Sequence, residues 1–365
     1  MTVVILSHTR GGLHHMKRAL GFLIVLSLMG TVFAAGCVTQ SGQSKNTVYE
    51  TSLKIGDMNE QLRTGNIDGF IAWEPVSSST VLSGTGKILV YSKEIWPDHP
   101  CCIIAASTNS LQKLDRNATI GFVWAHVKGT DFVNDPKNHD KTVQYVAEHA
   151  GVSIPAANES LKNIRYISET NVSSIRDYYN ELKNTSYLNK KVTDIGYSNE
   201  DQFFDSFVVQ GYVREVKDNL TKDPNWKPVS NNATIKFGTL PASSHDIADY
   251  VAQKEGYYKD VGLNVVVKQY ANGVALMEGF KTGEIDVGSF GLAPAILKRI
   301  NDDVNIAIIA GVHVDGSAIV IKNDDAIRSL KDLSGKNVAI PGRGTIQDIL
   351  LRMVARQNGF GVQVK

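Results

Sequence analysis

The segment Pro341-Gly342-Arg343-Gly344-Thr345 has the composition of an anion-binding turn, because it stands between an expected strand and an expected helix. Its glycines let the backbone approach a ligand closely, and the free N–H groups of a first helical turn attract an anion. Arg343 can add a charge-assisted contact, and Thr345 can donate a hydroxyl hydrogen bond. The same residues also fit an ordinary strand–helix turn that Thr345 caps, with Arg343 in solvent. The G-x-x-x-x-G-K-[ST] spacing of a nucleotide-binding loop is absent.

Further loops that end expected strands carry side chains able to contact a small ligand. Ser243 and Ser244 fit a helix cap, whereas His245 and His313 each offer an imidazole. The plain alternatives are a surface position for His313 and a place in the core for Trp73. With the turn described above, the expected ligand-binding residues are Trp73, Glu74, Ser243, Ser244, His245, Ser289, Phe290, Gly291, His313, Gly342, Arg343, Gly344 and Thr345.

The cysteine and histidine spacings give no support for a metal site or a catalytic centre. H-E-x-x-H, C-x-x-C and G-x-S-x-G patterns are all absent. Cys101 and Cys102 are adjacent, and neighbouring side chains on a strand point to opposite faces, so we expect buried thiols rather than a chelating pair. We therefore expect no catalytic residue, no metal and no cofactor.

Short apolar strands alternate with amphipathic helices along the chain, which predicts the α/β class. This pattern favours two mixed, mainly parallel sheets with helices on both faces. The expected strands span residues 67–73, 88–91, 103–106, 235–239, 263–269, 285–289, 305–310, 317–321 and 338–340. The expected helices span residues 58–63, 122–127, 142–150, 175–182, 246–255, 275–281, 294–299 and 346–357.

The N-terminus has the three parts of an export signal. A basic stretch, Met16-Lys17-Arg18, precedes the apolar run Ala19 to Ala35, and small residues lead into Cys37. We expect residues 1–36 to be a lipoprotein-type signal peptide, with Met16 a better start than Met1. Cys37 would then carry a lipid, and residues 37–46 would form a flexible tether. The alternative is a plain transmembrane anchor, and both interpretations place the rest of the protein outside the cytoplasm.

Charge and composition exclude several classes of protein. The chain has 365 residues, with 38 Lys+Arg against 37 Asp+Glu. Residues 1–36 contain three basic residues and no acid, so 35 basic groups face 37 acidic ones in the remainder. Without a basic excess, nucleic-acid binding is not expected. Three cysteines are too few for a disulfide framework.

Four stretches resemble the extracytoplasmic substrate-binding proteins of the nitrate/sulfonate/taurine type of ABC importer, a family that includes binders of thiamin-pyrimidine precursors. They are FGTLPASSHDIADYVAQKEGYYKDVGLNVVV (237–267), FKTGEIDVGSFGLAPAI (280–296), SLKDLSGKNVAIPGRGTIQDILL (329–351) and LRTGNIDGFIAWEP (62–75). The resemblance implies a two-lobed periplasmic-binding-protein-like fold with a ligand cleft between the lobes. It also implies a monomeric, non-enzymatic protein at the cell surface or in the periplasm, with the permease and its ATPase subunit as partners.

The order of these stretches is reversed relative to that family, whose members begin with the segment found here at residue 233. We interpret the reversal as a circular permutation, because the pieces make one complete set with nothing duplicated. The alternative is a fusion of two incomplete genes. The expected organisation is one lobe of residues 106–326, with a helical part 106–215, a linker 216–232 and an α/β part 233–326, and a second lobe of residues 47–105 plus 327–365.

The expected function is capture of a small anionic solute of the sulfonate, nitrate, taurine or bicarbonate class for delivery to a permease. A pyrimidine or another heterocyclic thiamin precursor is the alternative solute, which Trp73 and Phe290 would contact. A related pyrimidine-synthesis enzyme and a ligand-sensing module are the remaining alternatives.

Overall fold

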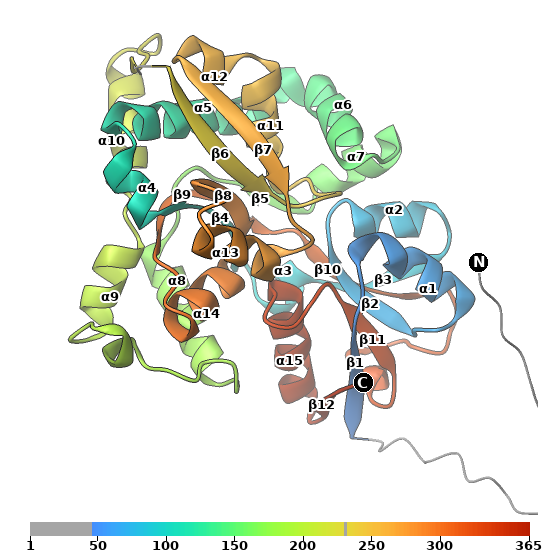
Figure 1. Cartoon of the computed structure of the whole chain (residues 1–365). Coiled ribbons are helices and arrows are strands. Elements are labelled where there is room, and N and C mark those ends of the chain that lie inside the picture. Colours follow the sequence, from blue (N-terminus) through green and yellow to red (C-terminus); the bar gives the residue numbers. More distant parts are fainter. Residues whose placement is uncertain (1–45, 230–231) are drawn as a thin grey trace, which may run out of the picture. The chain divides into compact units, whose positions relative to one another are not determined.

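Two six-stranded sheets form the framework of the computed structural model, which describes residues 46–229 and 232–365 (Figure 1). The expected signal peptide, the lipidation site Cys37 and almost all of the tether lie outside the described residues. No helix within the described ranges combines the length and the apolar character that crossing a membrane requires.

Sheet A joins the two ends of the described chain. Its strands follow the order β12 (Gly361–Val364), β1 (Thr47–Ser52), β11 (Asn337–Ile340), β2 (Gly69–Trp73), β10 (Ser317–Lys322) and β3 (Gly86–Tyr91). The first four run parallel, whereas β10 is antiparallel to both β2 and β3. The helices that contact this sheet are α1 (Met58–Thr64), α2 (Val76–Leu82), α3 (Ser92–Ile95) and α15 (Ile346–Asn358).

Sheet B has the order β5 (Ile164–Tyr166), β9 (Ile306–Asp315), β4 (Pro100–Ser107), β8 (Val287–Gly291), β6 (Ala233–Thr239) and β7 (Leu263–Gln269). Strand β4 is antiparallel to β8 and β9, while β6 is parallel to β7 and β8. The surrounding helices are α4 (Thr108–Lys113), α5 (Arg116–Asn134), α6 (His139–Ala150), α7 (Ile154–Leu161), α8 (Val172–Lys183), α9 (Glu200–Phe207), α10 (Gly211–Lys222), α11 (Ile247–Lys254), α12 (Tyr257–Asp260), α13 (Gly273–Lys281) and α14 (Leu292–Asn301).

Although antiparallel strand pairs are as frequent as parallel ones, the α/β class and the two mixed sheets flanked by helices are confirmed. The chain passes between them twice, from α3 into β4 and from β9 into β10, and the strands at these crossings pair antiparallel. Between β9 and β10 the chain turns at Gly316, whose φ of 89° is costly for other residues.

These crossings differ from the expected lobe boundaries. Strand β10 was expected with residues 106–326 but is part of sheet A. Residues 100–105 of β4 were expected with residues 47–105 but are part of sheet B. The expected boundaries differ because a pattern of apolar residues predicts a strand but does not show with which strands it pairs. Helix α10 also extends into the expected linker 216–232.

The largest hydrophobic core cluster is continuous between the two sheets. Phe70 and Trp73 of sheet A belong to the same cluster as Ile103 and Phe290 of sheet B. A separate cluster on sheet A includes Ile71, Ile319 and Leu351. The ends of strands from both sheets therefore meet in a buried region, and this region holds the residues considered next.

Candidate functional site

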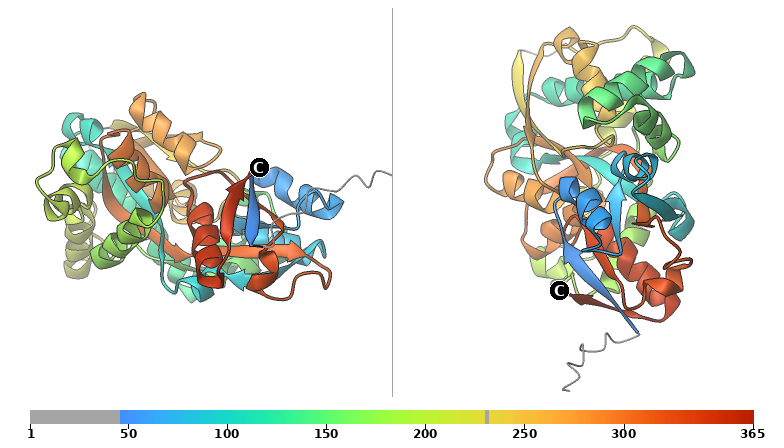
Figure 2. Two further views of the ribbon diagram at one scale, coloured as in Figure 1. Left: turned by 90° about the horizontal axis from the view of Figure 1, so that it is seen from below. Right: turned by 90° about the vertical axis from the view of Figure 1, so that its right-hand side faces the viewer.

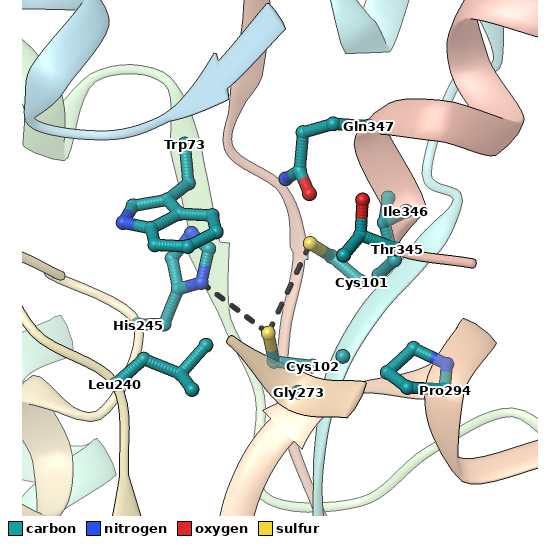
Figure 3. A pocket seen from close by; sticks show the side chains of 11 residues that line it. Trp73, Cys101, Cys102, Leu240, His245, Gly273, Pro294, Thr345, Ile346 and Gln347 are labelled. Atoms are coloured by element: carbon teal, nitrogen blue, oxygen red, sulfur yellow. Dashed lines mark hydrogen bonds between the residues drawn. The ribbon is translucent and has the colours of Figure 1, made fainter. Parts of the chain in front are cut away.

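A small cavity lies where strand ends of the two sheets meet the start of α15. Its volume is about 20 Å³, roughly the room that one water molecule needs. The residues that line it come from β2, β4, β8, the loop after β6 and the starts of α13, α14 and α15 (Figure 3). They are Trp73, Cys101, Cys102, Leu240, His245, Gly273, Gly291, Pro294, Thr345, Ile346 and Gln347.

The loop after β6 is fastened to the end of β2. The Trp73 indole N–H donates to the Ala242 carbonyl oxygen over 3.2 Å. The Ser244 hydroxyl donates to the Glu74 carbonyl oxygen over 3.0 Å. The Trp73 ring lies 6.0 Å from the His245 ring, tilted by 55°. Sheet A therefore covers one side of the cavity through Trp73, and these contacts link the two sheets.

Two thiols and two imidazoles gather at the cavity wall. The Sγ atoms of Cys101 and Cys102 are 4.0 Å apart. The Cys102 Sγ lies 3.3 Å from His245 Nδ1 (Figure 3). The ring centroids of His245 and His313 are 4.2 Å apart. One nitrogen or sulfur atom from each of the four residues lies within 4.8 Å of all the others, and all four side chains are buried.

A strand irregularity explains why two adjacent cysteines face the same cluster. On a regular strand their side chains would point to opposite faces, as the sequence led us to expect. The pairing of β4 with β9 shifts register on both sides of Cys102. Such an irregularity changes the direction of a side chain on the strand. Cys102 is also the cross-strand partner of His313 on β9 and of Gly291 on β8. The prediction that the thiols are buried is correct, but the prediction that they point apart is wrong.

Burial keeps His245, His313 and Cys102 uncharged. It lowers the pKa of His245 to about 4 and the pKa of His313 well below its ordinary value. Burial, with the neighbouring Cys101 thiol, raises the pKa of Cys102. At neutral pH both imidazoles are therefore neutral, and Cys102 is a thiol. None of the described residues that line the cavity is a lysine, arginine, aspartate or glutamate.

The expected anion-binding turn is occupied by the protein's own groups. The Gly344 N–H donates to the Asp348 carboxyl group over 2.6 Å. Thr345 accepts the Asp348 N–H and donates its hydroxyl to the Gly342 carbonyl oxygen. Arg343 is 52% exposed and stacks over the Tyr187 ring, outside the cavity lining. The structure thus matches the simpler interpretation of this turn, in which Thr345 caps a helix.

The structure brings only part of the expected residue set to the cavity. Trp73, His245, Gly291 and Thr345 line it. Of the other expected residues, His313 belongs to the thiol–imidazole cluster, and the Ser243 hydroxyl accepts the His245 N–H. The expected residues outside the lining are Glu74, Ser243, Ser244, Ser289, Phe290, His313, Gly342, Arg343 and Gly344.

The sequence interpretation missed seven lining residues. Five of them, Leu240, Gly273, Pro294, Ile346 and Gln347, have no distinctive chemistry by type or spacing. Cys101 and Cys102 did carry a signal, because adjacent cysteines stand beside Pro100 in a chain with one other cysteine. Only the irregular pairing of β4 turns that signal into a cluster with His245 and His313.

Two regions of the chain match models of known families. Residues 28–147 match the model described as the NMT1-like family, and residues 244–364 match the model described as NMT1/THI5 like. Among curated proteins, the nitrate import ATP-binding protein NrtC of Synechococcus elongatus is 30% identical over 101 residues. That match covers 26% of this chain and only 15% of the length of NrtC.

Two solved structures are similar over about three quarters of the chain. One is a phosphate-binding protein of a phosphate ABC transporter from Streptococcus pneumoniae, with 13% identity, 76% and 77% of the two chains covered and a TM-score of 0.29. The other is NikA from Brucella suis in complex with Fe(III)-EDTA, with 10% identity, 73% and 55% covered and a TM-score of 0.26.

Proposed function

We propose that this chain, whose residues 28–147 and 244–364 match the two NMT1-type family models, is the solute-binding protein of an ABC importer. The observation that carries the proposal is the cavity where strand ends of the two sheets meet, with Trp73 of sheet A beside His245 of the loop after β6. Binding proteins of this kind hold a solute between two lobes, and the solute favours the closed arrangement by contacting both.

The location and partners follow from the same proposal. The basic, apolar and small-residue order that leads to Cys37 supports an extracytoplasmic protein held to the outer face of the membrane by a lipid. We propose a monomer that delivers its solute to a permease and an ATPase subunit. We further propose that it does not turn the solute over.

The cavity lining favours the heterocyclic solute over the small anion. An aromatic ring and aliphatic side chains dominate it, and no arginine lines it, since Arg343 stacks over Tyr187 and lines a separate pocket. Gln347 donates its amide N–H to the Ser317 hydroxyl, which leaves its carbonyl oxygen able to accept. We therefore propose an uncharged pyrimidine-like ring that stacks on Trp73 and donates to Gln347.

A cavity of about 20 Å³ is far smaller than such a ring, so binding requires the two sheets to separate and close again. The contacts that would break include the hydrogen bonds from Trp73 to Ala242, from the Ser244 hydroxyl and N–H to the Glu74 carbonyl oxygen, and from Asn163 to the Glu74 carboxyl group. Each of these hydrogen bonds contributes about 1 kcal/mol, and opening would also expose part of the core that is continuous between the sheets.

The test is a thermal-shift and tryptophan-fluorescence screen of pyrimidines against taurine, other sulfonates, nitrate and bicarbonate. We expect a pyrimidine to raise the melting temperature and to change the emission of Trp73. Trp73→Phe should abolish the emission change, whereas Trp226→Phe, at a half-buried position away from the cavity, should keep it.

Other outcomes would reject parts of this proposal. If an oxyanion stabilised the chain and no pyrimidine did, the solute would belong to the small anions expected from the sequence. Chemical conversion of a bound compound by the purified protein would contradict the binding-only function. Arg343→Ala should leave pyrimidine affinity unchanged, because this side chain lies outside the lining.

A further inference from the structure

We propose that Cys101, Cys102, His245 and His313 form a binding site for a thiophilic transition-metal ion, with Zn²⁺ as the best match. The site adjoins the proposed solute cavity, but the inference does not rest on the transport function. All four ligands belong to sheet B or to the loop after β6, so metal binding does not require the two sheets to close.

The distances suit a tetrahedral ion. Zn–S bonds of about 2.3 Å and Zn–N bonds of about 2.0 Å place neighbouring ligand atoms about 3.3–3.8 Å apart in a tetrahedron. The Cys102 Sγ–His245 Nδ1 distance is 3.3 Å, and the Cys101–Cys102 Sγ distance is 4.0 Å. The largest separation in the set is within 4.8 Å. Side-chain adjustments of about 1 Å would therefore complete the coordination shell.

The imidazoles are prepared for coordination. His313 Nδ1 lies 3.4 Å from the Val314 carbonyl oxygen, while its Nε2 is buried without a hydrogen-bond partner. A metal-binding histidine commonly donates one ring N–H to a carbonyl group and binds the ion through the other nitrogen. Burial keeps His245 and His313 neutral, which is the form that binds a metal.

Without an ion, the cluster leaves a buried nitrogen of His313 unsatisfied. His313 Nε2, the nitrogen that would bind the ion, has no hydrogen-bond partner, and unpaired buried polar atoms are uncommon. A thiol is only a weak hydrogen-bond donor, so the Cys102 contact gives His245 little compensation. A metal ion would replace these weak contacts with four coordination bonds.

The ligand types select the ion. Two thiolates and two neutral imidazoles are soft or borderline donors, which favour Zn²⁺, Cu⁺ or iron over Mg²⁺ and Ca²⁺. Binding of Zn²⁺ converts two S–H groups into Zn–S bonds and releases two protons to solvent, with no change of oxidation state. Three of the ligands line the cavity, so an ion can enter by the path that a solute would use.

The experiment uses the reduced full chain and Co²⁺ as a spectroscopic probe that Zn²⁺ displaces. We expect one Co²⁺ per chain, a thiolate-to-metal charge-transfer band and visible bands typical of tetrahedral geometry. Cys102→Ser, His245→Gln and His313→Gln should each lower the Co²⁺ affinity by at least about tenfold. Near-UV circular dichroism of each variant shows whether it is folded.

Two matched controls should bind Co²⁺ like the wild type. His99→Gln alters an imidazole that is equally buried and whose ring nitrogens also make no hydrogen bond, but that lies outside the four-residue set. Cys37→Ser removes the remaining cysteine of the chain, which lies outside the described residues.

The wild-type spectrum decides the proposal even if a variant fails to fold. Absence of Co²⁺ uptake by the folded, reduced chain would overturn it, and so would an octahedral spectrum without a thiolate band. Isolation of the protein with Cys101 and Cys102 joined as a disulfide that persists under reduction would also overturn it. Because no solute is present, these outcomes are independent of the solute screen.

Discussion

Glu74 is a buried carboxyl group at the end of β2, next to the residue that covers the cavity. Its two oxygens accept hydrogen bonds from Asn163 Nδ2 at 2.9 Å and from the Ser78 N–H at 3.1 Å. Desolvation nevertheless raises its pKa from 4.5 to about 7, despite these hydrogen bonds. The sequence placed Glu74 among the ligand-binding residues, but its carboxyl group faces α2 and Asn163.

The raised pKa of Glu74 predicts stability that falls as the pH rises. Between about pH 4.5 and 7 the folded state holds a proton that the unfolded state has lost, so the free energy of unfolding decreases over this range. The upper limit of the loss is on the order of 3 kcal/mol. Glu74→Gln should flatten the dependence of the melting temperature on pH between pH 5 and 8, measured by calorimetry.

Glu60→Gln is the matched control for this measurement. Its exposed carboxyl group has a pKa lowered by the hydrogen bond from Arg63. Its contribution to stability is therefore constant above about pH 4.5, and the variant should keep the wild-type pH dependence. An unchanged slope in Glu74→Gln would show that other groups cause the pH dependence.

At the scale of elements, close helix packing fixes the loop that carries His245. Helix α11 begins just after that loop and packs against α5. His126 of α5 contacts the Asp249 carboxyl group of α11 at 3.1 Å and the Gly311 carbonyl oxygen of β9 at 2.7 Å. These contacts hold α11 and β9 in place, and with them two of the proposed metal ligands.

Gly129→Ala should destabilise this packing. A Cβ at position 129 would overlap the Ala248 carbonyl oxygen, so α5 and α11 would have to move apart. We expect a loss of about 1–3 kcal/mol in the free energy of unfolding, measured by urea denaturation. We also expect weaker Co²⁺ binding if α11 displaces His245.

Gly211→Ala is the corresponding control at the start of α10. A Cβ there would meet no atom within 4 Å, and alanine favours a helix. This variant should be neutral or more stable by up to about 1 kcal/mol. Equal stability losses in both variants would refute the packing explanation.

At the scale of the whole molecule, the two ends of the described chain lie side by side. Strands β1 and β12 pair in parallel, and the Lys365 N–H donates to the Glu50 carbonyl oxygen over 2.9 Å (Figure 2). This adjacency supports our proposal that the chain is a circular permutation. Because the strands are parallel, the end of β12 lies one strand length from the start of β1.

A rearranged gene tests that proposal. Residues 233–365 would come first, followed by a Gly/Ser linker and then residues 47–229. The linker must run back along a strand of four residues, about 13 Å, so about six to eight residues suffice. We expect the same near-UV circular dichroism and a melting temperature within a few degrees of that of the original order. Aggregation of the rearranged chain, beside a folded original, would contradict the permutation.

The sequence by itself determined the α/β class and most of the helices and strands near the cavity. It did so because hydrophobic periodicity, helix caps and glycine turns are local: α15 begins after the cap Thr345 and ends at Gly359, where φ is 77°. It also supplied the aromatic residue and the imidazole that face each other across the two sheets, Trp73 and His245.

Only the tertiary structure decided which of these residues act together. Arg343 lies over the Tyr187 ring, outside the cavity lining, and Asp348 and Thr345 already satisfy the turn that was expected to hold an anion. Cys101 and Cys102 joined His245 and His313 because of a register shift in β4, and such a shift leaves no periodic trace in the sequence. Strand pairing and side-chain direction depend on contacts between residues more than a hundred positions apart, and this is the physical reason that the site had to be found in the fold.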